Sequence, residues 1–166
     1  MPAASKTASS SSALKEGASA PAFNLPSTEG ANIRLSDYKG KKNVVLYFYP
    51  KDDTPGCTRE ACDFRDNLKK IQARDAVILG VSPDSVAAHD KFRDKYKLPF
   101  TLLSDESKEM LERYGVWKEK SLYGRKYMGV ERTTLIINKK GQISRIFPKV
   151  KVEGHWQEVL EALENA

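Results

Sequence analysis

The sequence predicts an α/β fold in which a mixed central β-sheet carries helices on both faces. Three observations lead to this prediction. Two apolar runs, 44–49 and 76–81, have the composition of buried strands. Each run is followed by a stretch with apolar residues at helical spacing. The chain then closes with a strand–turn–strand pattern at 133–147 and an amphipathic helix.

The first half of the chain leads to the first of these strands and its helix. An extended segment at 20–26 is expected before a short strand at 33–35 and a single helical turn at 36–40 that stops at a glycine. After the strand at 44–49, a helix is predicted from Thr58 onward. Its apolar residues recur at helical spacing and are Ala61, Phe64, Leu68 and Ile71.

The second half alternates in the same way and ends in a hairpin and a helix. The predicted elements are a strand at 76–81, a helix that Asp84-Ser85 caps and Pro99 ends, a strand at 100–103, a helix at 107–114, a loop at 117–128, strands at 133–137 and 142–147 around a turn at 138–141, and a terminal helix with Trp156, Val159, Leu160 and Leu163 facing inward. This order is that of the thioredoxin fold with insertions.

Most of the chain is expected to form one domain. At 166 residues it is long enough for a single sizeable core, and no linker or repeat divides residues 17–166. Residues 1–16 are rich in serine and alanine and lack apolar periodicity, which predicts a disordered tail or a tag remnant. The remnant of an organelle transit peptide is the alternative, which the lack of arginine disfavours.

The charge and the cysteine content indicate which kinds of partner and which cellular compartment to expect. Lys and Arg number 28 and Asp and Glu 22, so the net charge is +6. These charges are interspersed, which favours a solvated surface over a nucleic-acid-binding module. No apolar run approaches the roughly 20 residues that span a membrane. Two cysteines and no secretory apolar region predict a cytoplasmic protein.

The most informative stretch is the junction between the strand at 44–49 and the helix after it. Pro50 stops the strand, and residues 52–56 have the composition of a turn. Both cysteines of the protein, Cys57 and Cys62, therefore lie in the first turns of a helix that follows a buried strand. Unpaired N–H groups and the positive end of the helix dipole stabilise a thiolate at such a place, so thiol chemistry is predicted.

Cys57 is the better nucleophile candidate, because it lies at the helix entrance after Gly56, where a small residue allows a ligand to approach the backbone. Cys62 lies five residues later. In an α-helix this offset means a rise of about 7.5 Å and a rotation of roughly 140°. A disulfide tolerates Cα atoms only up to about 7 Å apart. A Cys57–Cys62 disulfide is therefore predicted to require unwinding of the first helical turns.

The same residues carry a family resemblance. Pro50, Thr54 and Cys57 stand at the spacing of the active-site signature of peroxiredoxins. The string Thr-Pro-Gly-Cys-Thr, with a second cysteine five positions later, resembles the bacterioferritin-comigratory or Q-type branch, whose members are atypical 2-Cys enzymes. This resemblance extends over nearly the whole chain beyond its tail. It implies a thioredoxin fold and a thiol-dependent peroxidase that reduces hydrogen peroxide and alkyl hydroperoxides.

The resemblance also implies roles for further residues. A peroxide needs donors that polarise its O–O bond, and the N–H groups of Gly56 and Cys57 with the Thr54 hydroxyl are candidates. Arg132 precedes a predicted strand as an arginine does in the family, and it is the expected cation. Glu60 lies three residues after Cys57 and is expected to hold Arg132 in a bidentate pair. An ordinary first-turn acid is the alternative for Glu60.

The implied catalytic cycle has three steps. The Cys57 thiolate takes an oxygen from the peroxide and becomes a sulfenic acid, which Cys62 then converts into a disulfide. An external dithiol, expected to be thioredoxin, reduces the disulfide. No metal, flavin or haem is required, and the Q-type resemblance favours a monomer.

Other interpretations of these residues fit less well. Taken alone, Cys62 would more often be a small core residue, but its offset from Cys57 favours the resolving role. The two cysteines could instead be ligands of a metal-binding or redox-sensing protein, although they fall short of a four-ligand zinc site. His89 and His155 lie on predicted helices far apart in the sequence and are expected at the surface.

Overall fold

A five-stranded mixed sheet forms the centre of the molecule. The structure, a computed structural model, describes residues 14–166, so most of the predicted tail lies outside the described residues. The strand order of the sheet is β5-β4-β3-β8-β9. These strands are β3 (Asn43–Phe48), β4 (Ala76–Ser82), β5 (Thr101–Ser104), β8 (Thr133–Ile137) and β9 (Ile143–Phe147).

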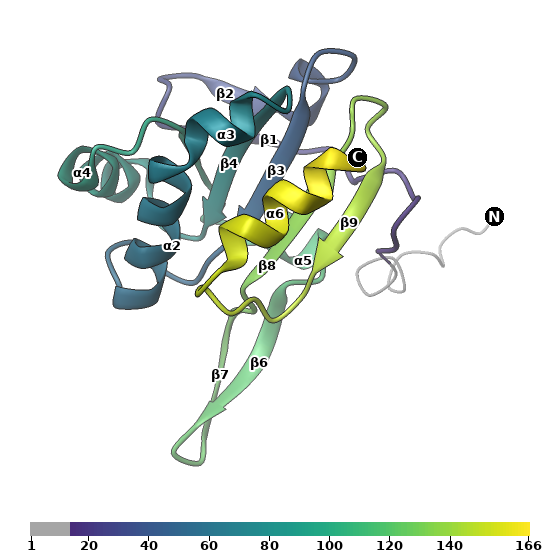
Figure 1. Ribbon diagram of the computed structural model, residues 1–166. Coiled ribbons are helices and arrows are strands. Elements are labelled where there is room, and N and C mark those ends of the chain that lie inside the picture. Colours follow the sequence, from purple (N-terminus) through teal and green to yellow (C-terminus); the bar gives the residue numbers. More distant parts are fainter. Residues whose placement is uncertain (1–13) are drawn as a thin grey trace.

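Helices cover both faces of this sheet. They are α2 (Pro55–Asp66), α3 (Leu68–Gln72), α4 (Val86–Tyr96), α5 (Glu109–Arg113) and α6 (His155–Glu164), together with the 3-10 turn η2 (Leu35–Asp37). In Figure 1, α2, α3 and α6 lie in front of the sheet and α5 lies behind it. Helix α4 contacts the edge strand β5. Among residues 14–166, no helix combines the length and the apolar character that crossing a membrane demands.

The position of β3 at the centre of the sheet explains why residues 44–48 form an unbroken apolar run. It pairs in parallel with β4 and antiparallel with β8. Alternate side chains point to opposite faces, so Val45 and Tyr47 pack under α2, α3 and α6, whereas Leu46 and Phe48 pack toward α5. Because both faces are covered, the residues after the half-buried Asn43 are all apolar or aromatic.

Most predicted elements are present within a few residues of their predicted bounds, including the turn between β8 and β9. The helix after β3 differs in two ways. It begins at Pro55, not at Thr58, because proline suits the first helical position and Thr54 takes the N-cap position. It also breaks at Asn67, whose side-chain amide bonds back to the Asp63 carbonyl at 2.8 Å, and α3 follows in a new direction.

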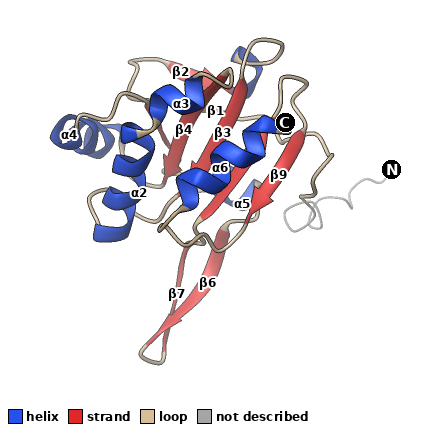
Figure 2. Ribbon diagram, viewed as in Figure 1, coloured by secondary structure: helices blue, strands red, loops and turns tan. Residues whose placement is uncertain are grey.

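The prediction of a loop at 117–128 was wrong. Residues Trp117–Leu122 (β6) and Arg125–Val130 (β7) form an antiparallel hairpin that projects from the body, as the red strands at the bottom of Figure 2 show. Tyr123 and Gly124 form a two-residue turn with φ of 51° and 78°, the geometry of a tight hairpin turn. Beyond its base, where Val130 is buried, the ribbon is solvated on both faces, so the alternation that marks a half-buried strand does not arise.

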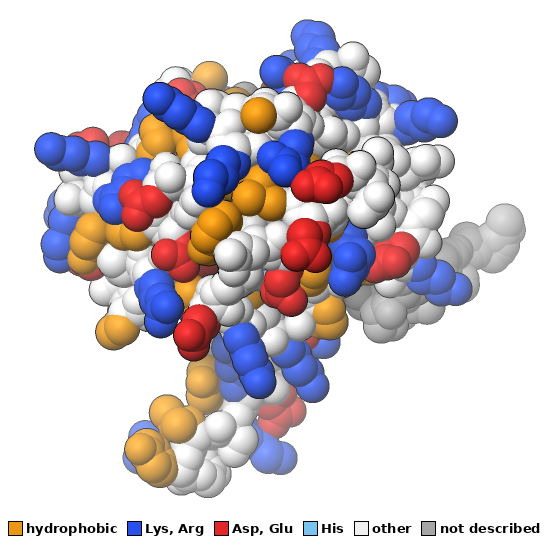
Figure 3. Space-filling model, viewed as in Figure 1, with side chains coloured by type: hydrophobic (Ala, Val, Ile, Leu, Met, Phe, Trp, Pro, Cys, Tyr) orange, Lys and Arg blue, Asp and Glu red, His pale blue; other side chains and the backbone are white. Residues whose placement is uncertain are grey.

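The end of this hairpin carries an exposed apolar group of side chains. Figure 3 shows orange side chains gathered at its tip beside blue ones. The large exposed hydrophobic residues of the described chain all lie here, and they are Leu122, Tyr123, Tyr127 and Met128.

The prediction that both histidines lie at the surface was also wrong, because His89 and His155 are buried. The ring of His155 contacts the Thr134 hydroxyl through Nε2 at 2.8 Å and the Glu158 carboxylate through Nδ1 at 3.0 Å. His89 is held by two acceptors in the same manner. Buried polar groups require such partners, and all of these partners except Glu158 come from other elements of the chain.

Two smaller antiparallel pairs complete the structure. One is the β6–β7 hairpin, and the other joins β1 (Asn24–Pro26) to β2 (Asn32–Arg34) ahead of β3. The N-terminal described residues lie against the edge strand β9, where the Glu16 carboxylate accepts a hydrogen bond from the Ile146 N–H at 3.1 Å.

Candidate active site

The junction after β3 places Cys57 in the third position of α2. Thr54 is the N-cap residue, with an extended backbone, and its hydroxyl donates to the Lys51 carbonyl at 3.0 Å. The first intrahelical bond runs from the Thr58 N–H to the Thr54 carbonyl at 2.8 Å. The N–H groups of Gly56 and Cys57 precede it and have no partner within the helix, so they remain free for a ligand.

Arg132 meets Cys57 from the other side of the site. It lies just before β8, and its Nη2 atom is 3.3 Å from the Cys57 Sγ atom. Its Nη1 atom donates to Glu60 Oε1 at 2.6 Å. The Arg132 side chain is 17% exposed and that of Glu60 is 2% exposed, so the ion pair is largely shielded from water. The structure thus brings Arg132 into contact with Glu60 and Cys57, which precede it by 72 and 75 positions in the sequence.

One detail of the Glu60 prediction was wrong. The pair with Arg132 uses a single carboxylate oxygen, and Glu60 Oε2 has no hydrogen-bond partner among the described residues. The second terminal nitrogen of the guanidinium faces the sulfur of Cys57 and is therefore not available for a bidentate contact. Arg132 acts as a bridge between an acid and a thiol, and Glu60 is more than an ordinary first-turn acid.

Burial controls the electrostatics of this group. It raises the pKa of the Glu60 carboxyl from 4.5 to about 7, against the opposing effect of Arg132. Burial lowers the pKa of Arg132, but the Glu60 carboxylate and the Cys57 sulfur raise it by more. The guanidinium therefore stays charged beside the sulfur, and the carboxyl neighbouring it is the group that changes protonation near neutral pH.

Glu60 is expected to make the folded protein less stable as the pH rises from 4.5 to about 7. In this interval the folded protein keeps the Glu60 proton that the unfolded chain has lost, so unfolding releases a proton and is favoured at higher pH. This contribution to the free energy of unfolding is fully present below pH 4.5 and is lost by about pH 7, and it amounts to about 3 kcal/mol. Urea unfolding at about pH 5 and about pH 8 measures it. The wild type should lose more stability over this interval than Glu60→Gln, and an equal loss in both proteins would contradict the assignment.

The guanidinium also lies close to the helix backbone at Gly56. A Cβ atom at this position would lie 3.3 Å from Arg132 Nη2, so the guanidinium would have to move by a few tenths of an ångström. The N–H groups at the helix start and the charge of Arg132 therefore face one small space, and glycine is what leaves that space open.

Gly56→Ala is expected to lower kcat/KM for peroxide by about 3- to 10-fold, because Arg132 is displaced from its place beside Cys57. Alanine favours the helix over glycine by up to about 1 kcal/mol, so the thermal stability should stay equal or rise. Steady-state peroxide turnover and a thermal unfolding curve test both parts. Unchanged turnover would show that the position of the guanidinium is not critical.

Cys62 lies on the same helix, which is continuous between the two cysteines. Both thiols are free. Burial raises the pKa of the Cys62 thiol above its usual 9.0. Cys62 lines a surface hollow together with Thr54, Pro55, Thr58 and Tyr96, whereas Cys57 does not. The two sulfurs thus lie in different surroundings while α2 is wound.

Sequence reasoning missed a second polar group beside the site. Asp52, Asp84 and His89 each place one potential ligand atom within 4.8 Å of the others. All three side chains are already engaged in hydrogen bonds within the protein, which disfavours a metal ion there. No sequence signal marks this cluster, because His89 stands among ordinary helix residues.

Comparison with known proteins decides the family. The sequence model of the AhpC/TSA family matches residues 17–146. The chain belongs to the AhpC/TSA family. Among curated AhpC/TSA relatives, the bcp protein of Coxiella burnetii is 54% identical over 150 residues, which cover 90% of this chain and 99% of the relative. Peroxiredoxin Bcp of Bacillus subtilis is 50% identical over 152 residues, with 92% and 96% covered.

Solved structures agree with this assignment. A mutant of Xylella fastidiosa PrxQ superposes with a TM-score of 0.86 at 36% identity and covers 92% of this chain and 96% of its own. Xanthomonas campestris peroxiredoxin Q gives a TM-score of 0.82 at 41% identity, with 86% and 90% covered. The chain is therefore a peroxiredoxin of the Bcp/PrxQ type with a thioredoxin fold, and it is a thiol-dependent peroxidase.

Proposed function

We propose that the protein reduces hydrogen peroxide and alkyl hydroperoxides at Cys57 and is recycled through a Cys57–Cys62 disulfide. The observation that carries this proposal is the position of Arg132, whose guanidinium contacts both the Cys57 sulfur and the Glu60 carboxylate. A fixed cation beside a thiol at a helix N-terminus favours the thiolate over the thiol.

In the first step, the Cys57 thiolate attacks one oxygen of the peroxide. The S–O bond forms as the O–O bond breaks, so the sulfur is oxidised to a sulfenic acid and the other oxygen leaves as water or an alcohol after gaining a proton. The free N–H groups of Gly56 and Cys57 face this space, and Arg132 supplies positive charge where negative charge develops. The Thr54 hydroxyl donates to the Lys51 carbonyl in this structure. It would donate to the peroxide after rotation of the Thr54 side chain.

In the second step, the Cys62 thiol attacks the sulfenic acid sulfur. The disulfide forms and one water leaves. The continuous helix between the cysteines separates the two sulfurs, and the first turns of α2 must unwind before they meet. Cys62 is suited to this step because it is half-buried and borders a surface hollow.

In the third step, an external dithiol reduces the disulfide and returns both thiols. We assign this role to thioredoxin. We further propose that the protein is a monomer of the reducing cytoplasm. The proposed cycle requires no metal, flavin or haem, and it involves no nucleic-acid or membrane partner. Alkyl hydroperoxides enter the proposal because one solved relative, the Xanthomonas campestris bacterioferritin comigratory protein, was studied for alkyl peroxide reduction.

Cys62→Ser separates the steps of this cycle. The variant should consume about one equivalent of peroxide per protein and then stop, because the sulfenic acid has no partner inside the chain. Further peroxide should convert Cys57 to the sulfinic acid, which mass spectrometry of the intact protein detects. The wild type under the same conditions should show a Cys57–Cys62 linkage in its peptide map and sustained turnover with thioredoxin and its reductase.

Two results would contradict the cycle. One is a wild type that forms no Cys57–Cys62 linkage after peroxide treatment. The other is a Cys62→Ser variant that keeps full thioredoxin-coupled turnover.

A further inference from the structure

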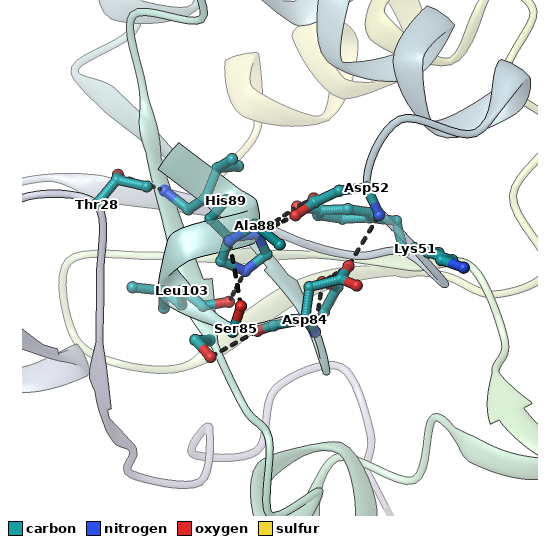
Figure 4. A network of polar contacts seen from close by, with 12 residues as sticks. Thr28, Lys51, Asp52, Asp84, Ser85, Ala88, His89 and Leu103 are labelled. Carbon is teal, nitrogen blue, oxygen red and sulfur yellow. Dashed lines mark hydrogen bonds and ion pairs between the residues drawn. The ribbon is translucent and has the colours of Figure 1, made fainter. Parts of the chain in front are cut away.

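A buried polar network ties the junction between β3 and α2 to the neighbouring helix α4 (Figure 4). Asp52 lies at its centre. Its Oδ2 atom is 2.6 Å from Nδ1 of His89 in α4, and its Oδ1 atom accepts a hydrogen bond from the Tyr49 hydroxyl at 2.6 Å. The His89 side chain is 0% exposed and that of Asp52 is 7% exposed, so water does not compete for these contacts.

Both ring nitrogens of His89 face acceptors. Nε2 is 2.8 Å from the Leu103 carbonyl oxygen at the end of β5, while Nδ1 faces Asp52. A neutral imidazole donates from one nitrogen only, so both contacts are hydrogen bonds when the ring carries both protons. In that form His89 and Asp52 make a charge-assisted pair, and a glutamine or asparagine at position 89 cannot reproduce both contacts.

The backbone of the junction is held at the same residue. The Asp52 N–H donates to Asp84 Oδ2 at 2.8 Å, and the Ser82 hydroxyl donates to the same oxygen at 2.6 Å. The Ser85 side chain accepts from the Ala88 N–H at 3.1 Å and caps α4 beside them. The main chain of Asp52 is thus held by the loop between β4 and α4, its side chain is held by α4, and neither attachment depends on α2.

The following residue has a weaker attachment. The Asp53 carboxylate accepts hydrogen bonds from Lys95 at 2.8 Å and from Tyr96 at 2.7 Å. The Lys95 and Asp53 side chains are 59% and 43% exposed, and exposed ion pairs contribute little. The buried contact between Asp52 and His89 therefore holds the junction more firmly than the exposed contacts of Asp53 do, and Asp52 lies only two residues before Thr54.

We propose that His89 is a positioning residue that fixes the pivot about which the first turns of α2 wind and unwind; the proposal rests on the function proposed above. With the helix wound, the fixed junction sets the place of Thr54 and Cys57 relative to Arg132. With the helix unwound, the same attachment keeps the junction in place and restricts the paths by which Cys57 can reach Cys62.

The two steps of the cycle should therefore respond to loss of His89 in opposite directions. Attack on the peroxide needs the wound helix and a well-placed junction, so it becomes slower. Formation of the disulfide needs the unwound helix, which is more accessible once the pivot is released, so it becomes faster. A residue that merely supported global stability would not separate the two rates in this way.

The test is rapid mixing of reduced His89→Gln with hydrogen peroxide, in a wild-type background for all other residues. Thiol trapping and mass spectrometry then give the rates of sulfenic acid and disulfide formation. Sulfenic acid formation should slow by about 10-fold, and disulfide formation should accelerate by about 3-fold or more. The fraction of Cys57 converted to the sulfinic acid at high peroxide should fall accordingly.

Asp52→Asn should show the same pair of changes, and the double variant should resemble each single variant, because the two residues act through one contact. This second variant also serves if His89→Gln folds poorly. Ile143→Val is the matched control, since Ile143 is fully buried in β9 at the opposite edge of the sheet. It should lower stability slightly and leave both rates unchanged.

The proposal is overturned if the variants slow both steps together, change neither step, or slow disulfide formation. It is also overturned if Ile143→Val reproduces the effect. A wild-type protein that forms no sulfenic acid with peroxide would instead remove the function proposed above. That result is distinguished from the others because it requires no variant.

Discussion

Cys57→Ser is expected to abolish peroxide reduction, with a loss of at least about 10⁴-fold in turnover. The hydroxyl of serine stays protonated at neutral pH, and its oxygen cannot pass through the sulfenic acid and disulfide states that the cycle needs. The fold should tolerate the change, because the side chain differs by one atom at a site that is 2% exposed. Thioredoxin-coupled peroxide consumption provides the measurement.

The comparison with Cys62→Ser makes this result specific. Both variants should be inactive in the coupled assay, but only Cys62→Ser should consume a single equivalent of peroxide. If Cys57→Ser also consumed one equivalent, Cys62 would be the attacking thiol and the two roles would be exchanged.

Arg132→Met should reduce kcat/KM for peroxide by about 10²- to 10³-fold, because it removes the charge beside the sulfur and leaves the buried Glu60 carboxyl without a partner. Arg132→Lys keeps the charge, but a single ammonium group cannot contact Cys57 Sγ and Glu60 Oε1 as the two terminal nitrogens do. Its loss should therefore be intermediate, about 10- to 10²-fold. The two variants separate the effect of charge from that of geometry.

The rate at which Cys57 reacts with an alkylating agent gives a readout that a general loss of stability would not produce. This rate should fall in Arg132→Met and fall less in Arg132→Lys. Arg125→Lys, in the exposed hairpin, is a matched control that should change neither activity nor the alkylation rate. Unaltered turnover in Arg132→Met would exclude this residue from the chemistry.

The sequence was sufficient to predict the junction and its cysteines, because the signals there are local. An apolar run, a proline and a helical pattern together fix where Cys57 lies. The contact with Arg132 is long-range, and its prediction came from the family resemblance, not from spacing. The antiparallel pairing of β3 with β8 is what delivers Arg132 to the start of α2.

Two of the features that were not predicted depend on partners distant in the sequence, and the third is a local hairpin. His89 is buried only because Asp52 and the Leu103 carbonyl arrive on either side of its ring. The single contact between Glu60 and Arg132 depends on how the guanidinium divides its nitrogens between an acid and a thiol. The β6–β7 hairpin was missed because only its base packs on the body, and burial is what gives a strand its alternating pattern.

The hairpin has a consequence for how molecules behave at high concentration. It is a ribbon of two strands that pair only with each other within residues 14–166, so the outer backbone edge of each strand is open. Such edges can accept a strand from another molecule and start aggregation, above all when apolar side chains lie beside them. Four positive side chains line this ribbon, and they are Lys118, Lys120, Arg125 and Lys126. Two of them pair with acids, Lys118 with Glu131 and Lys126 with Glu119, and the net positive charge that remains on the ribbon is expected to oppose edge-to-edge association between copies.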